Sequence, residues 1–151
     1  IPQWIHADRV WQTLHDLGWH VEVHTDQGAL PQVLAQLPAD LPLVVDHMGK
    51  PSEANVRDAT VQALVHRAQH VPTYIKLSGA YRLGGLEATR LAHLWQQEMG
   101  VHALLWGSDW PCTNHEHLAN YTDLFAALEP WVGSPQVDQV LRDNPERLYG
   151  F

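Results

Sequence analysis

The chain has 151 residues, which is enough for one domain with a sizeable hydrophobic core and short for two. Its 45% apolar and 17% charged residues are typical of a globular protein and argue against disorder. A formal charge of −8 and a pI near 5.7 leave no basic stripe, which argues against nucleic acid and anionic membrane surfaces as partners.

Predicted helices and strands alternate along the chain. In chain order, the hydrophobic periodicity predicts helix 6–18, strand 19–25, helix 28–37, strand 41–49, helix 53–70, strand 73–79, helix 86–100, strand 101–109, and helices 115–129 and 135–143. In the clearest helix, 53–70, one stripe is expected to hold Val56, Ala59, Ala63, Leu64 and Ala68. This alternation indicates an α/β fold, with one parallel sheet and right-handed crossovers in a single domain over residues 1–151.

Ionisable or hydroxyl side chains stand at the carboxyl ends of all four predicted strands. These strand ends carry His24, then Asp46 and His47, then Lys76 and Ser78, then Ser108 and Asp109. Parallel sheets bind ligands at the carboxyl ends of their strands, and a purely structural sheet would more often turn there on Gly, Pro or Asn. The pattern therefore predicts a functional site at this edge of the sheet.

Asp109 and His47 are the candidate catalytic residues. Asp109 lies between Trp106 and Trp110 at the end of an apolar strand, and partial desolvation there is expected to raise its pKa toward the range of a general base or metal ligand. His47 follows a β-branched strand and is placed to hold a substrate carbonyl, coordinate a metal or orient water. The alternatives are a turn or helix-capping aspartate and a packed histidine.

Three further side chains belong to the candidate set. His24, with His47 and Asp109, would give the three ligands that a catalytic metal site needs, although its strand also has a polar side for purely structural reasons. Lys76 is expected either to contact substrate or to pair with Asp46 or Glu22. Arg82, in the loop after its strand, is placed to bind a substrate carboxylate with two parallel hydrogen bonds.

The segment after Asp109 contributes Trp110 as a pocket wall and Asn114 as a substrate contact. Cys112 is the single cysteine, so an intrachain disulfide is excluded, and the chain shows no CxxC or zinc-knuckle spacing. With no long apolar stretch and no signal-peptide pattern, the sequence predicts a cytoplasmic protein outside the membrane.

Four motifs together resemble the metal-dependent-hydrolase-like amidohydrolase family, nearest to its 2-pyrone-4,6-dicarboxylate lactonase and sugar-lactone hydrolase branch. They are "VVDHMGKP", "YIKLSGAYRL", "LLWGSDWPCTN" and the terminal "DNPERLYGF", in that order and spacing. The resemblance implies a distorted (β/α)₈ barrel that opens a lactone or similar ester. It implies Asp109 as the base that activates water, His47 as the group that polarises the substrate, and Arg82 as the partner of a carboxylate-bearing substrate.

The resemblance also bears on cofactors. In the family, the pyrone lactonase branch is metal-independent, whereas other branches bind one divalent ion. The resemblance therefore allows two alternatives: one zinc or manganese ion bound by His24 and Asp109, or a reaction without a metal. Cys112 and Thr113 stand where pyrone lactonases often carry histidine or asparagine, which puts a dicarboxylate substrate in doubt.

The four predicted strands correspond to the C-terminal half of such a barrel, and the first strand, which carries an H-x-H pair in the family, has no counterpart among them. The expected partners are a small anionic substrate and either a missing N-terminal half or a second copy. Three alternatives remain: a decarboxylase or hydratase on the same scaffold; an inactive half barrel that associates through open edges; and, last, a flavodoxin-like phosphate binder, which lacks a glycine-rich first loop.

Overall fold

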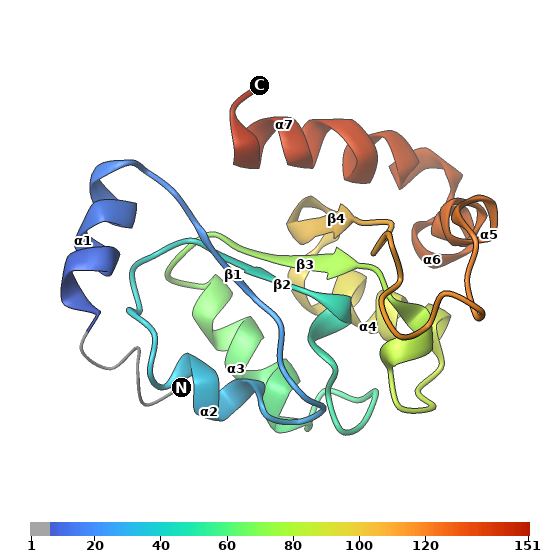
Figure 1. The fold of residues 1–151 in the computed structure, drawn as a ribbon, viewed down its shortest axis with the longest axis horizontal. Helices are drawn as coiled ribbons and strands as arrows, with labels where there is room; N and C mark the ends of the chain where they lie inside the picture. Colours follow the sequence, from blue (N-terminus) through green and yellow to red (C-terminus); the bar gives the residue numbers. More distant parts are fainter. Residues whose placement is uncertain (1–6) are drawn as a thin grey trace.

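A computed structural model describes residues 7–151 and places a four-stranded sheet at the centre of the fold (Figure 1). The strands are β1 (Val21–Val23), β2 (Leu43–Val45), β3 (Thr73–Leu77) and β4 (Leu104–Trp106). They are parallel and lie in the order β1-β2-β3-β4, with Val45 opposite Ile75 and Lys76 opposite Leu105. The predicted parallel α/β sheet is therefore confirmed.

The helices are α1 (Asp8–Asp16), α2 (Leu30–Leu34), α3 (Ala59–Ala68), α4 (Ala88–Met99), α5 (Tyr121–Ala126), α6 (Leu128–Val132) and α7 (Asn144–Tyr149). The first five helices fall within predicted helical segments and are shorter than predicted, whereas α6 runs past predicted helix 115–129 and α7 begins only after predicted helix 135–143. His6, where the first helix was expected to begin, lies outside the described residues. Residues 139–143, near the end of the last predicted helix, form a turn of π-helix that runs directly into α7.

The prediction of a helix from residue 53 is wrong at its amino-terminal end. The Asp58 side chain accepts hydrogen bonds from the backbone N–H groups of Thr60 and Val61, so it caps a helix that begins only at Ala59. Val56, expected on the buried stripe, lies before this cap and is 49% exposed. The helix-like spacing of apolar residues extends into the loop before Asp58. The cap ends the helix there, so this loop is not helical.

The two faces of the sheet pack against different layers. One face carries the main core with α3 and α4; its strand residues are Val23, Leu43, Val45, Ile75, Leu77 and Leu104. The fully buried indole of Trp95 on α4 lies in this core and donates to the Met48 carbonyl at 2.9 Å. Figure 1 shows α3 on one side of the strands and α7 on the other.

The second face, called the inner face below, carries a smaller apolar cluster and then the charged residues. Val44, Tyr74 and Leu105 are buried together, and Leu148 of α7 packs against them. The start of α7 is fixed by buried Asn144, whose Nδ2 donates to the carbonyls of Val101 and Leu104 at 2.8 and 2.7 Å. The other end of α7 reaches across to β1, since the Tyr149 ring meets His20 edge-on at 5.4 Å.

Both edges of this sheet are open within residues 7–151, because β1 pairs only with β2 and β4 only with β3. The same described range contains no helix of the length and apolarity that crossing a bilayer requires.

Candidate active site

A cavity of about 660 Å³ opens at the carboxyl ends of the strands. It is lined by every candidate residue from the sequence: His24, His47, Lys76, Arg82, Asp109, Trp110 and Asn114. Parallel pairing brings the strand ends to one edge, which explains how residues up to 90 positions apart share one cavity. Trp110 is 78% exposed, so it stands at the rim of the cavity and not in its interior.

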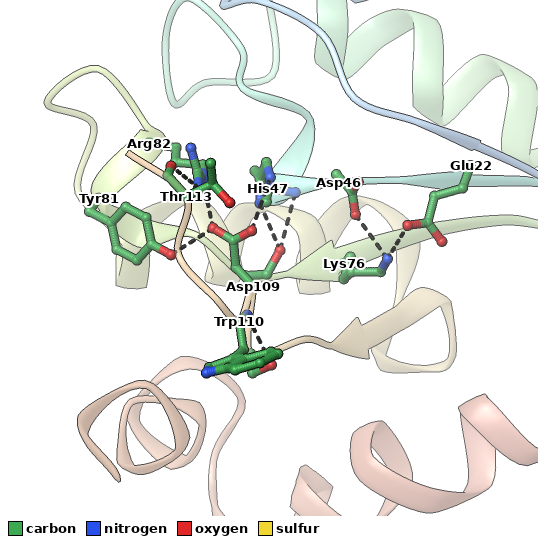
Figure 2. Close-up of polar contacts among 11 residues, drawn as sticks. Glu22, Asp46, His47, Lys76, Tyr81, Arg82, Asp109, Trp110 and Thr113 are labelled. Carbon is green, nitrogen blue, oxygen red and sulfur yellow. Dashed lines mark hydrogen bonds and ion pairs between the residues drawn. The ribbon is translucent and has the colours of Figure 1, made fainter. Parts of the chain in front are cut away.

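Asp109 is held by one of its two carboxylate oxygens (Figure 2). The Tyr81 hydroxyl and the Arg82 Nε both donate to Oδ2, each at 2.6 Å. The other oxygen, Oδ1, lies 3.8 Å from Nε2 of His47, beyond hydrogen-bond distance. The side chain of Asp109 is 16% exposed, so these contacts act in a partly desolvated site.

The expectation of a raised pKa at Asp109 is wrong. Burial pushes the pKa of this carboxyl upward, but the hydrogen bonds from Tyr81 and Arg82, with the positive charge of Arg82, outweigh it and leave the pKa below its usual value. The sequence placed Arg82 near the site but could not show that it donates directly to the carboxylate. Asp109 is therefore ionised at neutral pH. Both side-chain hydrogen bonds that it accepts within residues 7–151 are on Oδ2.

His47 is neutral and buried. Burial lowers its pKa to about 4, although Asp109 and Asp46 act in the opposite direction. Its Nδ1 lies 3.0 Å from the Ser78 hydroxyl, and its backbone N–H also donates to that oxygen at 3.3 Å. The ring meets that of His24 edge-on at a centroid distance of 4.7 Å. Ser78 therefore fixes the ring so that Nε2 faces Asp109.

Gly79 is required beside His47. Its φ of +57° is in the left-handed region, and a Cβ at this position would lie 2.6 Å from Nδ1 of the histidine. Any side chain here would displace the ring or change the backbone. The sequence contained this signal in "LSGAYRL", where a glycine directly follows Ser78.

Backbone strain gathers at the same strand ends. His47 and Asp109 have φ values of 50° and 55°, and Met48 and Lys50 are also in the left-handed region. Such conformations cost non-glycine residues roughly 1–3 kcal/mol each and persist where the surrounding structure imposes them. Both candidate catalytic residues are thus held in backbone conformations that local preference disfavours, which supports a functional reason for their placement.

Lys76 is engaged by both carboxylates that the sequence offered as its structural partners. Its Nζ lies 2.5 Å from Glu22 Oε1 and 2.9 Å from Asp46 Oδ1. Burial alone would lower the pKa of the ammonium, but these two bonds outweigh it and raise the pKa. Lys76 lines the cavity as part of this triad, and its role as a substrate contact stays a prediction.

Arg82 is engaged as well. Its Nε donates to Asp109, and its Nη2 donates to the carbonyl of Thr113 at 3.0 Å. A two-point grip on a substrate carboxylate through these nitrogens would require the arginine to leave Asp109. Asn114 has a φ of 67°, and its backbone N–H donates to Glu116 Oε1 at 3.1 Å.

Tyr81 is the residue that the sequence reasoning missed. It lies in the short turn Ala80–Arg82 after β3, and the Arg82 guanidinium lies 5.2 Å from the centre of its ring. Burial and the bond to Asp109 raise the pKa of the phenol, so the hydroxyl keeps its proton at neutral pH and donates a hydrogen bond. The available signal was its place beside Arg82 in "GAYRL".

The described residues do not assemble the predicted metal site. Within 7–151, no group of three or more His, Cys, Asp or Glu side chains converges at a spacing that could hold a metal ion. Asp109 Oδ2 already accepts two hydrogen bonds, and the one H-x-H of the sequence, His115 to His117, follows β4 in a turn region and does not lie on a strand. His24 as a metal ligand stays a prediction that this geometry does not favour.

Comparison with known proteins gives consistent matches over nearly the whole chain. Residues 2–151 match the family model described as Amidohydrolase. A 4-sulfomuconolactone hydrolase of Rhizobium radiobacter is 29% identical, over 95% of this chain and 51% of its own length. The chain spans about half the length of the curated relatives it matches.

Solved structures agree with the observed fold. The structure of a probable 2-pyrone-4,6-dicarboxylic acid hydrolase from Acinetobacter baumannii, with citric acid bound, superimposes with a TM-score of 0.78. It is 30% identical, and the match covers 95% of this chain and 57% of that one. An amidohydrolase from Burkholderia multivorans with bound zinc, at 22% identity and a TM-score of 0.73, shares the fold over 95% of this chain and 56% of its own. The predicted fold, part of an amidohydrolase barrel, is therefore confirmed. The chain covers about half of the length of these related structures.

Proposed function

Because the chain belongs to the amidohydrolase family, we propose that it supplies the base-bearing half of a hydrolase that opens a small lactone. The observation that carries this proposal is the arrangement of Asp109, with one oxygen held by two donors and the other directed toward neutral His47. The lactone hydrolases among its relatives support the choice of substrate class.

In the proposed reaction, Asp109 Oδ1 accepts a proton from a water molecule while the water oxygen attacks the lactone carbonyl carbon. Negative charge then develops on the carbonyl oxygen, where a protonated Nε2 of His47 would donate a hydrogen bond. The tetrahedral intermediate collapses, the ring C–O bond breaks, and the leaving alkoxide takes the proton back from Asp109. The product is an open-chain hydroxy acid.

Two details of the site support these roles. The lowered pKa keeps Asp109 ionised at neutral pH, so the base is in its reactive form when substrate binds. His47 is neutral, so an Nε2 proton would serve as a hydrogen-bond donor without placing a full positive charge beside the carboxylate. The Ser78 hydroxyl at Nδ1 is placed to donate to that nitrogen, which would leave the ring proton on Nε2.

The test is the Asp109→Asn variant of the full-length gene product, assayed against neutral and carboxylate-bearing lactones. We expect kcat to fall on the order of a thousandfold or more with the circular dichroism spectrum unchanged, because the base is lost. Asp138→Asn, at an exposed aspartate of the same chain, is the matched control. Near-wild-type turnover by folded Asp109→Asn would contradict the proposal.

Product analysis separates the alternatives on the same scaffold. Ring opening consumes one water and releases a single hydroxy acid. A decarboxylase would release carbon dioxide, and a hydratase would add water to a carbon–carbon double bond without opening a ring. If none of these reactions is found and the chain instead forms stable dimers, association through the open sheet edges becomes the better account.

A further inference from the structure

The Tyr81 hydroxyl and the Arg82 Nε converge on the same oxygen of Asp109, each at 2.6 Å. Figure 2 shows the two donors approaching from the turn after β3, while the other carboxylate oxygen faces His47. The two oxygens of a carboxylate are chemically equivalent, and a free side chain exchanges them by rotating about its last bond. In this site the two oxygens have different surroundings.

We propose that Tyr81 is a positioning residue that determines which oxygen of Asp109 reacts. It holds Oδ2 together with Arg82 and thereby keeps Oδ1 directed toward the cavity and His47. This inference deepens the proposed function and rests on it for its catalytic consequence. The structural part, that Tyr81 orients the carboxylate, stands on geometry alone.

Arg82 by itself would not define the orientation as strictly. Its Nη2 is turned to the Thr113 carbonyl, so the arginine gives Asp109 a single hydrogen bond and not a two-point clamp. The Tyr81 hydroxyl adds the second bond to the same oxygen. Charge-assisted hydrogen bonds of this length are strong and directional, and two of them fix the plane of the carboxylate better than one.

The phenol is itself held in place. The Arg82 guanidinium lies 5.2 Å from the centre of the Tyr81 ring, and the His115 ring packs against it at a centroid distance of 5.2 Å. The tyrosine therefore links the turn after β3 to the segment after β4, and it reaches Asp109 from the side away from His47. Its hydroxyl bonds to the oxygen that does not react, so Tyr81 acts through Asp109 and not on the substrate.

The first test compares Tyr81→Phe with wild type in the full-length gene product. Phenylalanine keeps the ring and its packing and removes only the hydroxyl. We expect kcat to fall by about tenfold to a hundredfold, because a base that samples wrong orientations reacts less often, while KM changes by about twofold or less. Tyr121→Phe removes an exposed phenol hydroxyl on α5 and is expected to behave as wild type. An unchanged kcat in Tyr81→Phe, or a loss confined to KM, would overturn the proposal.

The second test does not depend on activity. Crystal structures of wild type and Tyr81→Phe are expected to show one orientation of the Asp109 carboxylate in wild type and a rotated or divided orientation in the variant. A single unchanged orientation in Tyr81→Phe would overturn the inference even if the enzyme is a lactonase. A reoriented carboxylate in a protein that hydrolyses no lactone would instead support the positioning role and refute the proposed reaction.

Discussion

Replacing Lys76 with methionine removes the cation of the triad while keeping a long apolar side chain. Lys76 is 17% exposed and lies 2.5 Å from Glu22 and 2.9 Å from Asp46, so its loss leaves two carboxylates facing each other on the inner face of the sheet. We expect Lys76→Met to destabilise the fold because these charges lose the group that compensates their burial.

The magnitude follows from the burial of each partner. Breaking a fully buried ion pair costs about 3–5 kcal/mol, whereas an exposed pair contributes about 0–1 kcal/mol. Asp46 is 18% exposed and belongs near the first limit, while Glu22 is 41% exposed, so water screens its share. Together these limits give an expected loss of about 2–3 kcal/mol in the free energy of unfolding.

Urea denaturation followed by circular dichroism measures this loss, with Lys50→Met as the matched control. Lys50 is the only other lysine of the chain, and the structure gives it no ion pair within residues 7–151. The pKa of Lys76 is raised above 10.5, so its stabilisation is complete below that pH and is lost as the pH rises through the higher folded value. Wild type should therefore lose stability in strong alkali by more than Lys76→Met does. A loss below about 0.5 kcal/mol at neutral pH, within the usual effect of a surface substitution, would refute the reasoning.

Two further predictions concern the anchor of α7 and the titration of His47. Asn144→Ala removes both hydrogen bonds to the Val101 and Leu104 carbonyls from a fully buried position, so urea denaturation should show a loss of about 2–3 kcal/mol, and a loss below 1 kcal/mol would contradict the anchoring role. Burial lowers the pKa of His47 from 6.5 to about 4, so between these values the unfolded chain takes up the proton first and stability falls as the pH falls. His47→Gln should reduce that fall in pH-dependent denaturation, and an unchanged acid profile would argue against a buried neutral histidine.

Much of the site was predictable because the alternation of side chains identifies the strands and therefore the residues at their carboxyl ends. Polar residues at the ends of four parallel strands must meet at one edge, and all seven candidates do line one cavity. The contacts within the cavity were not predictable in the same way. The bond between Tyr81 and Asp109 joins two loops 28 residues apart, and its geometry depends on the turn after β3.

The pKa of Asp109 shows what a local reading of the sequence leaves out. Neighbouring tryptophans correctly suggested desolvation, which does act to raise the pKa. The sign of the net shift is decided by donors from another loop, because charge-assisted hydrogen bonds stabilise the ionised form. The start of α3 was misplaced for a similar reason: the apolar spacing was right for a helix, but capping by Asp58 determined where the helix begins.

The inner face of β3 shows how the fold separates stability from chemistry. Alternate residues along β3 and just past its end have different contacts: Tyr74 packs in an apolar cluster, Lys76 forms an ion triad, and Ser78 contacts His47. The triad therefore lies next to the packed base of the sheet and also lines the cavity. Asp46 of this triad acts to raise the pKa of His47, against the larger effect of burial, and its ion pair with Lys76 offsets part of that charge. A lysine engaged in structural ion pairs thus favours the neutral form of a histidine that it does not touch.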